Sequence, residues 1–138
     1  MRLHRNAKAD LLRRVPLFAG LSRRELEQLG GIADELDLRE GRTLIKQGDR
    51  GREFFTLLEG EATVAQDGKT LRTLRGGDFF GEIALVTDVP RTSTVTTTSA
   101  VRLLVLTKRD FQRLMREQPS IQRKVLEALA QRLAPETL

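Results

Sequence analysis

The sequence predicts a mainly β protein with flanking helices (α+β), in which an antiparallel β-roll or jelly-roll barrel carries helices at both ends. Short β-prone runs separated by glycine-bearing turns fill residues 36–106, which is typical of such a barrel. Apolar residues recur at helical spacing on both sides of this region. A length of 138 residues fits one domain. We therefore expect a single domain, residues 1–138, with N-terminal helices in 1–35, a β-roll in 36–106 and C-terminal helices in 107–134.

Two helices are expected in the N-terminal region. The segment from Arg2 to Arg14 is basic, and its apolar residues lie at roughly helical spacing until Pro16 interrupts them. Ser22-Arg23-Arg24-Glu25 then forms a capping box, a pattern in which the serine and glutamate side chains each accept a hydrogen bond from the other's backbone N–H. The second helix is therefore expected to begin here.

Six β-prone runs follow, and one of the turns between them is strongly indicated. Asp67-Gly68 is a hairpin signal, because a tight primed turn needs positive φ angles. The other glycines of the region are expected at its remaining corners. The runs cover residues 42–46, 54–58, 62–66, 70–74, 92–99 and 101–106.

The C-terminal region again shows helical spacing. Thr107-Lys108-Arg109-Asp110 resembles a capping signal. Pro119 suits the first turn of the last helix, and Pro135 is expected to end that helix. Between the two prolines runs an apolar stripe made of Ile121, Val125, Leu126, Leu129 and Leu133.

One segment, Phe79 to Val95, combines several kinds of binding chemistry in the run FFGEIALVTDVPRTSTV. Gly81 before a short apolar stretch lets backbone N–H groups point at an anion. The planar guanidinium of Arg91 matches the paired oxygens of a phosphate. Glu82 is suited to accept hydrogen bonds from ribose hydroxyls. Together these residues predict a site for a nucleotide monophosphate.

This segment resembles the phosphate-binding cassette of cyclic nucleotide-binding domains, the family found in bacterial catabolite regulators, cyclic-nucleotide-dependent kinases and gated ion channels. The similarity joins Phe-Gly-Glu-aliphatic-Ala-Leu to Arg-Thr-Ser-Thr-Val at the family's spacing. It extends upstream through Gln47-Gly48-Asp49 and Gly76-Gly77-Asp78 and covers nearly the whole chain. We call residues 79–95 the cassette.

The resemblance implies a role for each cassette residue. Glu82 would take the ribose 2′-hydroxyl, and Arg91 would pair with the cyclic phosphate. The backbone amides of Ile83 and Ala84, together with Gly81 and Thr92, would complete the phosphate contacts. Two further candidates for ligand contact are Phe80 and Ser93.

Base preference stays open between two ligands. Many family members carry alanine where this chain has Ser93, and in parts of the family a threonine at the position of Thr92 goes with a guanine base. The breadth of bacterial-type relatives favours cAMP as the expected ligand, with cGMP as the alternative. No catalytic cofactor is expected.

The resemblance further implies a regulatory module that couples binding of a cyclic nucleotide to movement of the flanking helices. The alternative is the ligand-sensing fragment of a catabolite-regulator-type transcription factor, or of a larger cyclic-nucleotide-regulated protein. In the family the terminal helix covers the base or pairs two subunits. The C-terminal stripe is therefore a candidate surface for a second copy of the chain or for an effector protein.

Composition argues against other classes of protein. The chain has no cysteine and one histidine, His4, which leaves no metal site and no catalytic triad, so we expect no enzyme. The net charge is +5, but acidic residues interleave with the basic ones and Trp and Tyr are absent, so direct nucleic-acid binding is not expected. No apolar run is long enough to span a membrane, and residues 1–12 lack the apolar centre of a secretory signal. We expect a cytoplasmic protein.

Overall fold

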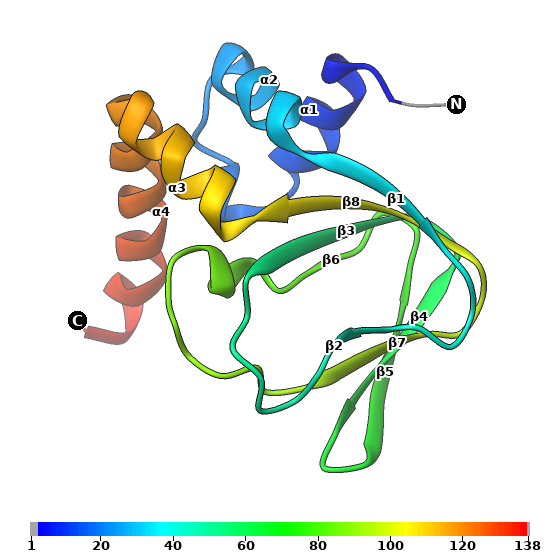
Figure 1. Ribbon diagram of the computed structural model, residues 1–138. Helices are drawn as coiled ribbons and strands as arrows, with labels where there is room; N and C mark the ends of the chain where they lie inside the picture. The colour runs from blue at the N-terminus through cyan, green and yellow to red at the C-terminus, as the bar shows by residue number, and fades with distance from the viewer. Residues whose placement is uncertain (1–2, 138) are drawn as a thin grey trace. The chain divides into compact units, whose positions relative to one another are not determined.

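The computed structural model describes residues 3–137, including all their side chains except those of residue 5 and residues 132–137. The chain divides into two compact units (Figure 1). The helical unit comprises Met1–Ala33 and Arg109–Leu138, and the β unit comprises Asp34–Lys108.

The β unit consists of two antiparallel sheets of four strands each, which confirms the predicted β-roll with flanking helices. The first sheet has the strand order β1-β8-β3-β6, and the second has the order β2-β7-β4-β5. Figure 1 shows the two sheets facing each other. The strands are β1 (Asp34–Leu38), β2 (Thr43–Ile45), β3 (Glu53–Glu59), β4 (Glu61–Gln66), β5 (Lys69–Arg75), β6 (Phe79–Phe80), β7 (Thr94–Thr97) and β8 (Val101–Thr107).

The core of the β unit lies between the sheets and draws side chains from both. Phe80 of β6 stacks on Phe55 of β3 with ring centroids 5.1 Å apart. Burying a side chain of this size stabilises a fold by roughly 1.5–3 kcal/mol. Because Phe80 is anchored in this way, the residue that follows it, Gly81, begins the cassette turn from a fixed point.

The predicted hairpin turn between β4 and β5 is confirmed. Asp67 and Gly68 both have positive φ, at 51° and 79°, as a primed turn requires. The Gln47 side chain pairs with this turn twice, because its Nε2 donates to Asp67 Oδ1 at 2.8 Å and its Oε1 accepts from the Asp67 N–H at 2.9 Å.

All six predicted runs contain a strand, but two strands were not predicted. β1 reads Asp-Glu-Leu-Asp-Leu, which is poor in strand-forming residues, and it is an edge strand that pairs only with β8. β6 has only two residues, too few to show a period. The run predicted for 92–99 is shorter in the structure, since β7 begins at Thr94.

The helical unit contains the predicted helices with shifted ends. The first helix ends before Pro16 and Pro119 opens the last helix, both as expected. Pro16 also opens a short 3-10 helix, η1, which was not predicted. Pro135 does not end that helix, which continues to Thr137, so this prediction was wrong; a proline removes one backbone donor without removing the other hydrogen bonds of a 19-residue helix. The elements are α1 (Arg5–Arg13), η1 (Pro16–Phe18), α2 (Arg23–Ile32), α3 (Lys108–Glu117) and α4 (Pro119–Thr137).

The predicted stripe of α4 is not uniformly buried. Ile121 and Val125 are 0% and 2% exposed, whereas Leu126 is 66% exposed. Leu129 is intermediate, and the side chain of Leu133 lies outside the described residues. Among the described side chains of the stripe, Leu126 is therefore the large apolar one that lies at the surface. No helix within the described residues is long and apolar enough to cross a membrane.

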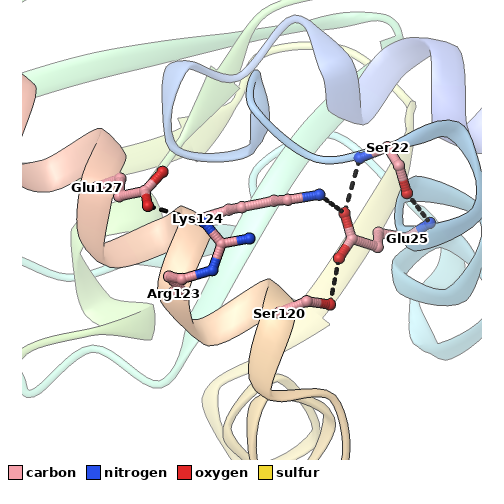
Figure 2. Close-up of polar contacts among 6 residues, drawn as sticks. All are labelled: Ser22, Glu25, Ser120, Arg123, Lys124 and Glu127. Carbon is pink, nitrogen blue, oxygen red and sulfur yellow. Dashed lines mark hydrogen bonds and ion pairs between the residues drawn. The ribbon is translucent and has the colours of Figure 1, made fainter.

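The predicted capping box at the start of α2 is confirmed and forms part of a larger polar cluster (Figure 2). Glu25 Oε1 accepts from the Ser22 N–H at 2.8 Å, and the Glu25 N–H donates to Ser22 Oγ at 3.2 Å. The same carboxylate accepts from Lys124 Nζ at 2.6 Å and from the Ser120 hydroxyl at 2.5 Å, both on α4. Glu25 thus joins α2 to α4 within the helical unit.

The environment of Glu25 favours its charged form. Burial alone would raise the pKa of its carboxyl group, but the hydrogen bonds from Lys124, Ser120 and Ser22 outweigh burial and lower the pKa from 4.5 to about 2. A carboxyl group whose pKa is lowered on folding stabilises the fold above its ordinary pKa. It loses that contribution as the pH falls toward the folded value.

We predict that Glu25→Gln lowers the free energy of unfolding at neutral pH by roughly 1–3 kcal/mol, because a neutral amide loses the ion pair and leaves the Lys124 ammonium without its partner. The difference between wild type and variant should shrink as the pH falls from 4.5 toward 2. Denaturant unfolding of both proteins across this range measures it.

Glu27→Gln is the matched control, because Glu27 lies on the same helix and, within the described part of the chain, its ion pair is the 3.5 Å one with Arg23. A stability difference for Glu25→Gln that equals that of the control, or that does not change with pH, would contradict the prediction.

Candidate functional site

After β6, the cassette makes a left-handed turn at Gly81. This residue has φ 83° and caps a short 3-10 helix, η2 (Glu82–Leu85). A Cβ atom at Gly81 would lie 2.7 Å from Arg91 Nη1 and 3.1 Å from the Glu53 carbonyl oxygen. Glycine is therefore required at position 81 for two reasons: the left-handed backbone conformation and the close approach of Arg91.

Two backbone carbonyls hold the guanidinium of Arg91. Nη2 donates to the Glu53 carbonyl at 2.6 Å, and Nη1 donates to the Gly81 carbonyl at 3.2 Å. The Arg91 N–H donates to the Asp49 carbonyl at 2.8 Å, which fixes the backbone of the same residue. These bonds place the guanidinium at the start of β3, beside the turn that precedes η2.

Gly51 lies on another side of the guanidinium. A Cβ atom there would approach Arg91 Nε to 2.5 Å and the Ala84 methyl group to 2.7 Å. Such distances are shorter than any normal contact, so the arginine and η2 occupy the space that a side chain at position 51 would need. The fold brings together residues from three separate segments: Gly51, the pair Gly81 and Ala84, and Arg91.

The charge of Arg91 has no ion-pair partner among the residues that the structure describes. Burial lowers the pKa of this half-buried guanidinium, and the negative charges of Glu53 and Glu82 raise it by less. Backbone carbonyls orient a cation without cancelling its charge. Arg91 can therefore offer that charge to an anion at the cassette.

The other predicted site residues lie around this cation in different environments. Glu82 is half-buried in the first turn of η2, close enough for its charge to act on Arg91. The Ala84 amide donates to the Gly81 carbonyl at 3.2 Å. The Ile83 side chain is 39% exposed. Glu82, Ile83 and Ala84 are consecutive residues of η2, directly after the glycine turn.

Three further candidates flank this group. Thr92 is exposed and Ser93 is half-buried, and both follow Arg91 in the loop that leads to β7. Phe80 is buried against Phe55, so its ring serves the core of the β unit. Its role as a ligand contact stays a prediction.

The outer loop of the cassette, Thr87-Asp88, is tied down by residues that sequence reasoning did not single out. Lys108 Nζ donates to the Thr87 carbonyl at 3.0 Å and to Asp88 Oδ1 at 2.6 Å. Arg50 Nη1 donates to the Asp88 carbonyl at 3.0 Å. The hydrogen bond from Lys108 is the main cause of the lowered pKa of Asp88.

Two of the unpredicted contributors, Glu53 and Gly51, share a reason for being missed. Glu53 acts through its backbone carbonyl, and Gly51 acts by lacking a side chain. Neither property leaves a side-chain pattern in the sequence. A second glycine three residues after Gly48 is the only signal that could have pointed to this position, and turn glycines are too common to make it specific.

The sequence profile of the cyclic nucleotide-binding domain matches residues 35–118. The chain therefore belongs to the cyclic nucleotide-binding domain family, as the resemblance of its cassette predicted.

Individual relatives agree with this assignment. The chain is 38% identical over 117 residues to a cAMP-dependent protein kinase regulatory subunit of Colletotrichum orbiculare, an alignment that covers 83% of this chain and 30% of that protein. It is 36% identical over 112 residues to a cGMP-dependent protein kinase of Toxoplasma gondii, covering 80% of this chain and 11% of that protein. The chain thus spans less than a third of the length of either relative.

A solved structure is similar over nearly the whole chain. The N-terminal domain of a transcriptional regulator from Streptomyces coelicolor A3(2) has a TM-score of 0.83 and 32% sequence identity, over 93% of this chain and 92% of that one.

We predict that Gly51→Ala destabilises the protein by roughly 1–3 kcal/mol, because the added methyl group must displace Arg91 or Ala84. Gly20→Ala is the matched control, since a Cβ atom there meets nothing within 4 Å. Thermal unfolding of both variants provides the comparison. Equal melting temperatures for Gly51→Ala and the control would show that the close approach at Arg91 does not constrain the fold.

Proposed function

We propose that the β unit binds a cyclic mononucleotide, cAMP or cGMP, at the cassette. The observation that carries this proposal is the Arg91 guanidinium, which is half-buried, is oriented by the carbonyls of Glu53 and Gly81, and has no ion-pair partner among the described residues. A singly charged phosphate diester would supply the missing negative charge, and the planar guanidinium would meet two of its oxygens.

The remaining groups suit the rest of such a ligand. Glu82 would accept a hydrogen bond from the ribose 2′-hydroxyl, because a carboxylate repels phosphate but readily accepts a hydrogen bond from a neutral hydroxyl. The amides of Ile83 and Ala84, which lie in the turn beside Arg91, would donate to phosphate oxygens. Binding the phosphate through Ala84 would require its amide to leave the 3.2 Å bond to the Gly81 carbonyl, so a small rearrangement of the turn would accompany binding.

The choice of base rests on the residue beside the arginine. Thr92 is exposed, so its hydroxyl is available to a ligand. Of the two kinase relatives, one is named as cAMP-dependent and the other as cGMP-dependent. We propose cAMP as the first ligand and cGMP as the competing one.

The proposed biological role is regulation of an effector. Ligand binding can shift a protein between states only if the ligand prefers one of them. A rearranged cassette turn would provide such a preference and would pass it to the helical unit. The effector would be a protein or a second copy of the chain, contacted through α4, where Leu126 is 66% exposed. Similarity to the regulator from Streptomyces coelicolor favours the alternative that the chain is the sensor portion of a transcription factor.

We predict that the wild-type protein binds cAMP or cGMP, and that Arg91→Ala weakens this binding by about ten- to a hundredfold because it removes the charge-assisted contact to phosphate. Isothermal titration calorimetry of both proteins measures the change, with 5′-AMP as the control ligand. The stronger of the two cyclic nucleotides identifies the base.

Arg72→Ala is the matched control variant, because Arg72 is an exposed arginine on β5, outside the cassette. It should bind like the wild type. Unchanged affinity in Arg91→Ala, for a variant whose circular dichroism spectrum is that of the folded protein, would refute the assigned role of Arg91. A folded, ligand-free wild type that binds neither cyclic nucleotide would refute the proposed function.

A further inference from the structure

Along the chain, the β unit ends at Lys108. This residue is also the first residue of α3, which continues into the helical unit. Its side chain is only 18% exposed, although lysine is usually found at the surface. A lysine buried to this extent must have partners for its ammonium group, and both partners lie in the outer loop of the cassette: the Thr87 carbonyl at 3.0 Å and Asp88 Oδ1 at 2.6 Å.

Thr87 connects this loop directly to η2. Its N–H and its hydroxyl both donate to the Ile83 carbonyl, at 3.0 and 3.1 Å. Its own carbonyl accepts from Lys108. One residue, Thr87, therefore separates the amide-bearing turn of the proposed phosphate site from the first residue of α3.

A second connection runs through the start of β3. The Lys108 N–H donates to the Arg52 carbonyl at 2.8 Å. The neighbouring carbonyl along the chain, that of Glu53, accepts from Arg91 Nη2 at 2.6 Å. Arg91 and Lys108 thus bind adjacent peptide groups. A shift of Arg91 toward a ligand would therefore disturb the Arg52 carbonyl, which accepts from the first residue of α3.

We propose that Lys108 is a positioning residue that couples occupancy of the cassette to the state of α3, by holding the Thr87-Asp88 loop to the first residue of that helix. This inference rests on the proposed function, since it requires a ligand at the cassette. Two contacts fix the geometry, a charged one to Asp88 and a carbonyl one to Thr87. When η2 rearranges around an anion, the loop moves with it, and the lysine carries that movement to the helix.

A purely stabilising lysine would behave differently from a coupling one. Loss of a stabilising contact would lower the melting temperature and leave the response of α3 to ligand intact. Loss of a coupling contact would separate two responses that the wild type shows together, that of the cassette and that of α3. The test therefore measures the two segments independently in one protein.

The experiment is hydrogen–deuterium exchange, read by mass spectrometry over residues 82–91 and 109–117, with and without saturating cAMP or cGMP. In the wild type, ligand should change exchange in both segments. Lys108→Met should retain affinity within about fivefold, because Lys108 is not among the predicted ligand contacts and a partly exposed ion pair contributes little energy. It should keep the change in 82–91 and lose at least about half of the change in 109–117.

Three further variants make the result specific. Lys108→Arg, which can donate to both acceptors, should restore the response of α3. Asp88→Asn, which removes only the charge of the exposed partner, should weaken the response in part and serves if Lys108→Met fails to fold. Lys69→Met, an exposed lysine on β5, should behave as wild type.

The outcomes separate the two proposals. A wild type that binds neither nucleotide would overturn the proposed function and this inference with it. If the wild type and Lys108→Met both bind ligand and show the same ligand-dependent change in hydrogen exchange over residues 109–117, the coupling role alone would be overturned. So would a wild type whose cassette responds to ligand while 109–117 does not.

Discussion

The structure of the cassette depends on how one guanidinium is held. Arg91 donates to the carbonyls of Glu53 and Gly81, which belong to the first residue of β3 and to the turn after β6. These bonds bring two distant parts of the chain to the same point and orient a positive charge without neutralising it. Because burial already opposes that charge, an anion at this position would gain more from the arginine than it would from one in full contact with water.

The surrounding fold serves this arrangement. Phe80 stacks on Phe55 in the core and so fixes the residue at which the chain turns left-handed. Gly51 and Gly81 leave the space that the arginine fills. Lys108 and Arg50 hold Thr87-Asp88 through its carbonyls. The cassette is therefore confined at both ends, and movement within it has few directions available.

Much of this organisation could be predicted from the sequence, and the parts that could not share a physical cause. The Asp67-Gly68 turn and the Ser22-Glu25 capping box depend on local chemistry, and both occur as predicted. β1 was missed because an edge strand can be held by pairing with β8 alone, despite its acidic residues. The cassette residues were predicted from a local run of residue types, whereas the carbonyl of Glu53, the space at Gly51 and the contacts of Lys108 arise only when distant segments meet.

Whether Arg91 binds the ligand phosphate can be read from the NMR signal of the Arg91 Nε–H group, followed while cAMP or cGMP is added to isotope-labelled protein. If Arg91 offers its charge to the ligand phosphate, this signal should shift with the same stoichiometry as the backbone amides of Ile83 and Ala84, and 5′-AMP should not reproduce the shift at equal concentration. A ligand that shifts backbone amides elsewhere in the β unit while leaving the Arg91 side chain unchanged would contradict the account.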